Sequence, residues 1–123
     1  MRMIEIDYEA QPPIDSYGPG GFRIADQWYA GGLILLSDGI FPIAPPISIV
    51  GLRPVFDRAA DIDVLLIGQG ADIAPIAREL RSALDEAGIG FEIMSTPSAC
   101  RTYNVLLTED RRVGVALLPA DYG

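Results

Sequence analysis

The chain has 123 residues, with nine Arg, no Lys, seventeen acidic residues, no His and one Cys, and its formal net charge is −8. These counts exclude a Ser-His-Asp or Cys-His catalytic pair, Schiff-base lysine chemistry and a P-loop lysine within the chain. They also exclude an internal disulfide and a zinc site built from Cys and His. Because nucleic-acid binding relies on neutralising phosphates with Lys and Arg, no nucleic-acid partner is expected.

The composition favours one ordinary domain. Half of the residues are hydrophobic, which is enough for a core at this length. No run approaches ~20 apolar residues, so no transmembrane helix is expected. The first residues include acids where a signal peptide needs an apolar stretch, which favours a cytoplasmic protein. We expect a single domain over residues 1–123, with residues 1–13 either part of it or an irregular arm.

The first half of the chain is predicted to be β-rich and antiparallel. Asp38-Gly39 suits a tight hairpin turn, and Pro42 confines the strand that follows to a sheet edge or a bulge. The predicted strands are a short edge strand at Met3, Ile4 and Ile6, a half-buried strand over 22–24, one buried strand over 28–36 with a kink at Gly31-Gly32, and a return strand over 40–43.

The second half is predicted to alternate strands and helices. An aliphatic run at 64–67 is typical of a strand buried on both faces. A helix from 74 or 75 to 87 follows, then a strand over 89–94, a helix that begins with Thr96 as N-cap and Pro97 at its first position and ends near 108, and a strand over 113–118. The fold class is therefore α/β: a layered single domain with a mixed central β-sheet, an N-terminal antiparallel hairpin layer and a C-terminal β-α-β-α-β unit.

A crevice is expected where the two predicted parallel strands end. Ligands of open α/β sheets bind outside the carboxyl ends of the strands, and helix N-termini there favour a carboxylate, a phosphate or a carbonyl group. The candidate ligand- or partner-binding residues in these two loops and the second helix are Gly68, Gln69, Gly70, Asp72, Thr96, Ser98, Cys100, Arg101 and Asn104.

Each of these candidates has a plainer interpretation. Gly68 and Gly70 lack the third glycine of a dinucleotide fingerprint, because position 73 is Ile, and they can simply form a tight turn. The helix start and Arg101 are expected to lower the pKa of Cys100 somewhat, whereas the plainer interpretation is a small buried hydrophobe. Arg101 and Asn104 share a helix face, where Arg101 either binds a carboxylate, is solvated, or pairs with Glu92 or Asp72.

Two other clusters carry weaker signals. Asp57, Asp61 and Asp63 do not match a calcium loop, so a solvated face or helix caps are favoured over a metal site. Tyr17, with glycines at 18, 20 and 21, and the pair Trp28-Tyr29 either line a partner surface or pack under hairpin turns.

Several segments together resemble one known family. They are residues 34–42 with their Asp38-Gly39 turn, residues 65–70, the Gly88-Ile89 break, residues 94–106 and residues 109–113. The family is a small single-domain one of largely unknown function that includes the mitochondrial respiratory complex I assembly factor three and bacterial relatives. The resemblance covers about residues 14–118 and implies an α/β/α-type layered fold with a mixed central sheet. It also implies no established catalysis, and action through protein interaction.

Two functions remain open from the sequence. The favoured one is a non-enzymatic protein-interaction or assembly-factor-like module with protein partners, no cofactor and no metal. The sequence does not decide whether the chain also forms a homo-oligomer. The alternative is a protein or enzyme that binds a small anionic ligand in the crevice around residues 68–72 and 96–104, with Cys100 as a reactive thiol. No close pair of acids with catalytic spacing is visible.

Overall fold

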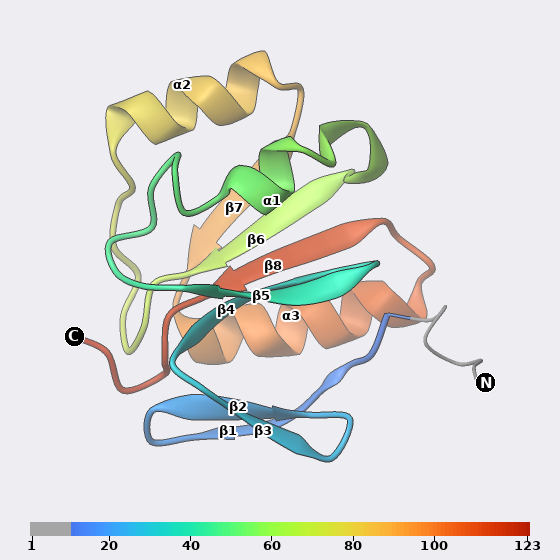
Figure 1. Ribbon diagram of the computed structural model, residues 1–123, viewed down its shortest axis with the longest axis vertical. Helices are drawn as coiled ribbons and strands as arrows, with labels where there is room; N and C mark the ends of the chain where they lie inside the picture. The colour runs from blue at the N-terminus through green and yellow to red at the C-terminus, as the bar shows by residue number, and fades with distance from the viewer. Residues whose placement is uncertain (1–10) are drawn as a thin grey trace.

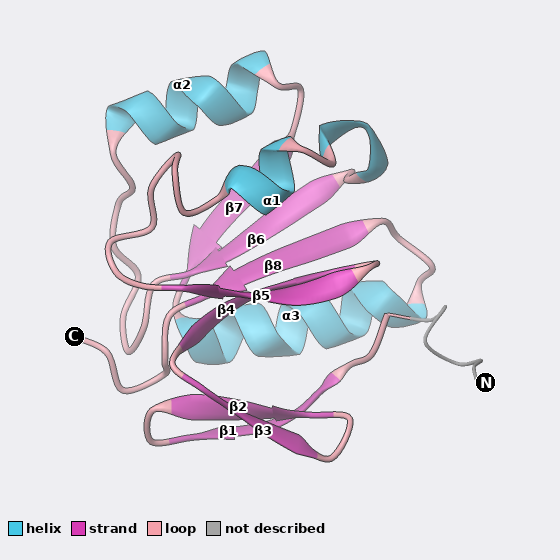
Figure 2. Cartoon of the chain, in the orientation of Figure 1, coloured by secondary structure: helices cyan, strands magenta, loops and turns pink. Residues whose placement is uncertain are grey.

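The computed structural model describes residues 11–123, and within this range the chain forms two β-sheets with helices packed on the larger one (Figures 1 and 2). The strand predicted at Met3, Ile4 and Ile6 lies outside the described residues. The elements in chain order are β1 (Ile14–Gly18), β2 (Gly21–Ile24), β3 (Gln27–Ala30), β4 (Gly32–Leu36), β5 (Gly39–Ile43), α1 (Arg53–Phe56), the 3-10 helix η2 (Ala59–Asp61), β6 (Val64–Gly68), α2 (Arg78–Glu86), β7 (Gly90–Met94), α3 (Thr96–Thr108) and β8 (Val113–Leu117).

The strand order confirms the predicted fold class. Strands β1, β2 and β3 form a separate antiparallel sheet, whereas the five-stranded sheet has the order β5-β4-β8-β6-β7. In the larger sheet β4 is antiparallel to β5 and β8, while β6 is parallel to both β7 and β8. The central sheet is therefore mixed, and its parallel part is the β-α-β-α-β unit. Pro42 lies on β5 at the sheet edge, where a missing N–H is tolerated.

Side chains of the central strands alternate between two cores on opposite faces of the sheet. Leu65 and Ile67 of β6 pack with α1 and α2 on one face, through Leu84 among others. Leu66 of the same strand points to the other face, where it packs with Tyr103 of α3. The small sheet lies on this second face as well, because its buried residues belong to the same core (Figure 1).

The prediction of one strand over 28–36 is wrong. The structure divides this run into β3 and β4, which belong to different sheets. The division occurs at Gly31, whose φ of +85° is accessible to glycine and whose N–H donates to the Gly20 carbonyl at 2.7 Å. The Gly-Gly pair is therefore a corner between two sheets, and an apolar run alone does not reveal it.

The first predicted helix begins later than expected, because α2 starts at Arg78. The side-chain amide of Gln69 donates to the carbonyl oxygens of Ala74 and Pro75, both at 3.2 Å. A helix through this segment would use those carbonyls within its own first turns. Residues 73–77 instead form no helix and no turn, and Ala77 is the extended N-cap.

The second predicted helix is confirmed, with a one-residue correction at its start. Ser95 rather than Thr96 is the N-cap, since the Ser95 side chain accepts a hydrogen bond from the Ser98 N–H at 3.4 Å. Thr96 is the first helical residue, and its hydroxyl bonds elsewhere. Two consecutive hydroxyl residues both suit an N-cap, so the sequence alone does not choose between them.

Candidate functional site

The two loops of the predicted crevice do meet, and their meeting point is a buried network around Thr96. Its hydroxyl accepts from the Gly70 N–H at 2.9 Å and donates to the Leu118 carbonyl at 2.7 Å. The Thr96 N–H donates to the Gly70 carbonyl at 2.8 Å. Thr96 is 0% exposed, so the side chain that was a candidate for ligand binding satisfies two backbone groups of the chain itself, and the Thr96 N–H satisfies a third.

The segment that follows β8 covers this network. The Leu118 N–H donates to the Gly68 carbonyl, and the Ala71 N–H donates to the Tyr122 carbonyl, both at 2.9 Å. Gly70 has φ of +103°, and a Cβ there would lie 2.4 Å from the Tyr122 oxygen. The glycine is thus needed because the chain's own backbone approaches closely. In this structure, residues 118–122 take the place next to Gly70 that a ligand would need.

The start of α3 has no free first-turn donor within the described chain. The Thr96 N–H is bonded to Gly70, Pro97 has no N–H, and the Ser98 N–H bonds to the Ser95 hydroxyl. The Ala99 N–H donates to the Ser95 carbonyl at 2.9 Å as the first regular helical bond. A helix N-terminus attracts anions through unpaired N–H groups, and these are already paired.

Cys100 is a buried hydrophobe of the core that faces α3. Burial raises the pKa of the Cys100 thiol to about 12, although the neighbouring Arg101 guanidinium lowers it. The expectation of a lowered pKa is therefore wrong, because loss of solvation outweighs the charge and the helix start. The thiol is protonated near neutral pH and is hidden from solvent.

Arg101 and Asn104 differ in their surroundings. Arg101 is exposed, and its guanidinium donates to the Ser98 hydroxyl at 3.3 Å; it forms no ion pair with Glu92 or Asp72. The Asn104 side chain bonds both backbone groups of Ile14, each at 2.9 Å. Asn104 therefore anchors β1 to α3, a structural role that the sequence did not indicate.

Two of the three residues of the acidic cluster, Asp57 and Asp63, form ion pairs. Asp63 binds Arg112 at 2.8 Å, and Asp57 lies 3.8 Å from Arg53. Within residues 11–123, no group of three or more His, Cys, Asp and Glu side chains could hold a metal ion. Arg112 holds the pKa of Asp63 below its usual value through its hydrogen bond and charge. Asp57 and Asp63 are thus each paired with a nearby arginine of the chain.

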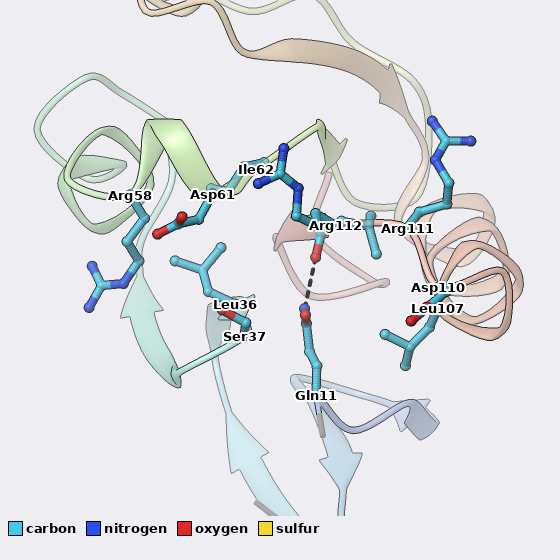
Figure 3. Close-up of a pocket in the computed structure, with 11 residues that line it drawn as sticks. Gln11, Leu36, Ser37, Arg58, Asp61, Ile62, Leu107, Asp110, Arg111 and Arg112 are labelled. Atoms are coloured by element: carbon cyan, nitrogen blue, oxygen red, sulfur yellow. Dashed lines mark hydrogen bonds between the residues drawn. The ribbon is translucent and has the colours of Figure 1, made fainter. Parts of the chain in front are cut away.

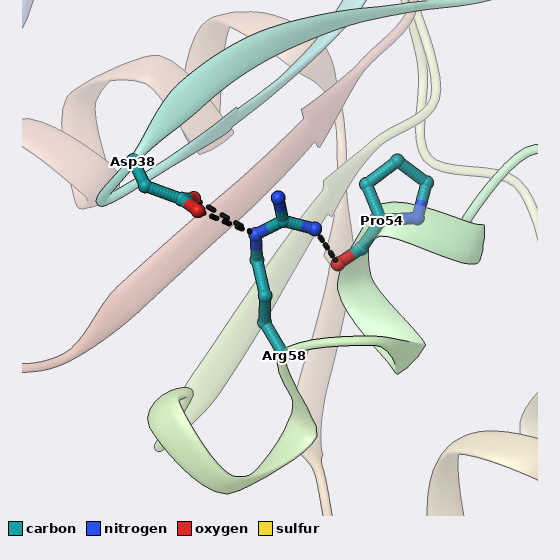
Figure 4. A network of polar contacts seen from close by, with 3 residues as sticks. All are labelled: Asp38, Pro54 and Arg58. Atoms are coloured by element: carbon teal, nitrogen blue, oxygen red, sulfur yellow. Dashed lines mark hydrogen bonds and ion pairs between the residues drawn. The ribbon is translucent and has the colours of Figure 1, made fainter.

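One cavity, of about 480 Å³, lies before the amino ends of β6 and β8, and we call it the arginine cavity. Arg58, Arg111 and Arg112 line it, yet their guanidinium groups point in different directions and do not converge (Figure 3). Arg58 donates to both oxygens of Asp38 and to the Pro54 carbonyl (Figure 4). Arrangements of this kind hold loops together and leave little charge for a ligand.

A second cavity of about 500 Å³ lies at the carboxyl ends of β6 and β8, and we call it the apolar groove. Loops 44–52 and 69–77 lie side by side along it (Figure 1). It is lined by Pro46, Ile47, Ser48, Ile49, Val50, Gln69, Ala74, Pro75, Ile76, Ala77, Glu79, Leu80, Leu118 and Tyr122.

Large apolar side chains at the apolar groove remain exposed. Val50 is 85% exposed, Tyr122 44% and Ile49 43%, and Ile73, just outside the lining, is 68% exposed. Contiguous exposed apolar surface marks interaction sites more often than a scattered Leu or Val does. No motif in the sequence predicts this site. The available signal was two adjacent β-branched residues and a lone Ile within loops rich in Pro and Gly.

Gln69 and Asp72, two predicted site residues, lie by this groove rather than in a separate crevice. Gln69 lines it and braces its wall through Ala74 and Pro75. Asp72 is exposed and begins the loop toward α2. Of the aromatic candidates, Tyr17 is exposed, and the Trp28 ring packs over Gly21, where a Cβ would lie 2.7 Å from the ring.

Comparisons with known proteins place this structure among relatives. The chain is 48% identical over 107 residues to an uncharacterized protein of Rhodobacter capsulatus, which covers 87% of this chain and 84% of that protein. It is 32% identical over 127 residues to NADH dehydrogenase (ubiquinone) 1 alpha subcomplex assembly factor 3 of Danio rerio, covering 100% of this chain and 73% of the relative.

A solved structure is also similar over most of both chains. The crystal structure of an outer membrane protein from Bartonella henselae has a TM-score of 0.86 and 39% identity, and it covers 90% of this chain and 97% of its own. In the described part of our chain, no helix is long and apolar enough to cross a membrane. A family model described as "Protein of unknown function (DUF498/DUF598)" matches residues 14–118. The resemblance identified from the sequence is confirmed, and the chain belongs to this family, which is shared with the complex I assembly factor.

Proposed function

We propose that this protein is a non-enzymatic, assembly-factor-like interaction module that docks a partner polypeptide in the apolar groove. The observation that carries the proposal is the exposure of Ile49, Val50 and Tyr122 around a cavity of about 500 Å³. Fully burying one Val or Ile side chain contributes about 1.5–3 kcal/mol. A few such residues are enough for an interface in which a small number of side chains dominate binding.

The chemistry of the groove suits a polypeptide better than a substrate. A small-molecule site holds a few convergent polar groups that orient the ligand. The polar lining residues of the groove are Ser48, Gln69 and Glu79, and the Gln69 amide group is already bonded to two carbonyls. The chain has no His or Lys, and Cys100 is buried. Docking of a polypeptide does not require the catalytic side chains that this chain lacks.

The relatives support the same class of function. The Danio rerio relative is named as an assembly factor, which implies action on protein partners. The anion-binding alternative receives no support from the start of α3, whose first-turn donors are paired within the chain. We place the protein in the cytoplasm, where its single free Cys would stay reduced.

The proposal is tested by site-specific crosslinking in cells. A photo-crosslinking residue replaces Val50 in one variant and Val105 in another; Val105 is also an exposed valine, but it lies on α3. The proposal predicts a discrete partner captured at position 50 and absent at position 105. The captured protein is then identified, purified and titrated against this chain.

The titration compares two matched variants. The double variant Ile49→Ser, Val50→Ser is expected to bind the purified partner at least about tenfold more weakly, because apolar contacts at the centre of an interface dominate its affinity. Val105→Ser is expected to bind as the unaltered protein does. Equal binding by all three proteins would contradict the proposal, as would groove-dependent binding to phosphatidylcholine vesicles in place of a protein.

A further inference from the structure

One wall of the apolar groove carries unpaired backbone groups, and this observation bears on what the groove recognises. Within residues 11–123, the N–H groups of Asp72, Ile73, Ala74, Ile76 and Ala77 donate no hydrogen bond to other described atoms. Residues 73–77 form no helix or turn, and these residues are exposed or, for Ile76, half-buried. The wall is therefore a run of backbone donors open to solvent beside an apolar surface.

The wall is held in place rather than left loose. The Gln69 amide donates to the Ala74 and Pro75 carbonyls, and the Ala71 N–H before the wall is bonded to Tyr122. After the wall, the Ala77 carbonyl accepts from Leu80 and Arg81 at the start of α2. A braced segment loses less conformational entropy on binding than a mobile loop does.

The charges around the groove are acidic. Glu79 is the one charged residue among the described residues that line it, and Asp72 and Asp121 lie next to Ile73 and Tyr122 in the chain. Arg78 precedes Glu79 on α2 but is not part of the lining. The chain as a whole carries a net charge of −8. A partner with cationic side chains is therefore favoured in encounter and in register.

The geometry points to an extended partner segment, with apolar side chains alternating with Lys or Arg, that pairs its backbone with residues 72–77. Alternate side chains of an extended segment point to opposite faces. Its carbonyl groups therefore accept from alternate open N–H groups and its apolar side chains enter the groove, while its cations stay outside the groove in the field of Glu79, Asp72 and Asp121. Such backbone pairing gives affinity, while the side-chain pockets give selectivity. This inference deepens the proposed function and rests on it.

The test uses a short synthetic peptide of alternating Val and Lys with blocked ends, and a matched peptide of alternating Val and Glu. NMR spectra of the protein are recorded with each. The Val-Lys peptide is expected to shift the amides of residues 73, 74, 76 and 77, to protect from exchange the amides of Ile73 and Ala77, which lie on the same side of an extended segment, and to leave the amide of Val105 unchanged. The Val-Glu peptide is expected to bind at least about tenfold more weakly.

A backbone substitution isolates the pairing itself. Ala77 has φ of −61° and ψ of 146°, values that proline adopts, and its N–H has no partner in the described chain. Ala77→Pro removes that one donor and is expected to weaken Val-Lys binding about fivefold. Ala77→Ser keeps the N–H and is expected to bind as the unaltered protein does.

The outcomes separate this inference from the proposed function. If the protein partner crosslinks at position 50 while its complex leaves the amides of residues 73–77 unshifted and unprotected, backbone pairing is overturned and the docking groove stands. Equal binding of the two peptides, at matched ionic strength, overturns the cationic preference. Because the amide measurements use the unaltered protein, they decide the question even if Ala77→Pro fails to fold.

Discussion

The two ends of the parallel strands of this protein are built in opposite ways. At the amino ends, the arginine cavity is lined by charged residues, and Arg58 and Arg112 are paired within the chain. At the carboxyl ends, the apolar groove has a similar volume but exposes Val50 and Tyr122 to solvent. Size therefore does not distinguish the two cavities. What distinguishes them is that Arg58 and Arg112 already have acidic partners in the chain, whereas Val50 and Tyr122 leave apolar surface exposed.

The difference between the two ends indicates that the residues at the amino end contribute to stability and those at the carboxyl end to binding. Paired charges at the amino end hold loops to the sheet and are worth little to a ligand. The apolar surface that stays exposed at the carboxyl end gains nothing from burial in the isolated fold, and it becomes favourable only when a partner covers it. Substitutions at the two ends should therefore differ in which property they change.

The largest effect is expected below the groove, at Thr96. Thr96→Val keeps the shape of the side chain but removes the hydroxyl that bonds Gly70 and Leu118. Two buried backbone groups then lack partners, which is expected to lower the free energy of unfolding by about 2–4 kcal/mol. Urea titration followed by circular dichroism measures this loss.

Thr108→Val is the matched control, because Thr108 ends the same helix and its hydroxyl bonds the Val105 carbonyl at an exposed position. Its loss of stability should stay below about 0.5 kcal/mol. Equal losses for the two variants would mean that the Thr96 network does not support the carboxyl end of the sheet.

An intermediate effect is expected from Cys100 at high pH. Its pKa is raised from 9.0 to about 12 in the folded protein, so the unfolded chain releases the thiol proton first. The stabilising contribution is full below pH 9 and is lost as pH rises from 9 to 12. Burial also raises the pKa of Tyr103 above its ordinary value of 10.0, but below pH 10 this phenol stays mostly protonated even in the unfolded chain and contributes less. Between pH 9 and 10 the free energy of unfolding should therefore fall by up to about 1 kcal/mol through Cys100.

Cys100→Ala removes this pH dependence and is the comparison for it. Its unfolding free energy, measured by urea titration at several pH values, should fall less steeply between pH 9 and 10. Identical slopes for the two proteins would show that the thiol is not protected by burial. Slow labelling of the folded protein by a thiol reagent at neutral pH is an independent readout of the same burial.

The smallest effect is expected in the arginine cavity. Arg58 donates three hydrogen bonds and lies 4.8 Å from the centre of the Phe41 ring. Arg58→Lys cannot reproduce this planar arrangement, so a loss of about 0.5–1 kcal/mol is expected in thermal unfolding. Arg111→Lys is the control, since Arg111 lines the same cavity and its side chain makes no hydrogen bond or ion pair with the described residues. A larger loss for Arg111→Lys would reverse the expectation.

The main architecture could be predicted because it follows from local patterns. The aliphatic run of β6, the Asp38-Gly39 turn before β5 and the apolar stripe of α3 each have a period or a turn residue that identifies them. The corner at Gly31 and the late start of α2 could not be predicted in this way. Both depend on hydrogen bonds to distant or non-helical partners, the Gly20 carbonyl and the Gln69 amide.

The candidate site was predicted only in part, for a similar reason. Proximity of the loops that contain Gly70 and Thr96 follows from parallel strands and was correctly anticipated. The hydrogen bond by which Tyr122 covers the loop at Gly70 was not anticipated, because the residues after β8 show no periodic pattern. The groove was missed because it forms where residues 46–50, 69–77 and 118–122 meet. The exposure of Val50 depends on how these three segments pack against each other, and the sequence of one segment does not reveal that.

The position of β8 has a consequence for how the chain is made. Among the strands of residues 11–123, β8 comes last, and it joins the β4-β5 hairpin to the β6-β7 pair. A nascent chain on the ribosome therefore holds two separate half-sheets with open edges until residues 113–117 have emerged. Open edges invite pairing with other chains, so the partly synthesised sheet is prone to aggregation until β8 joins its two halves.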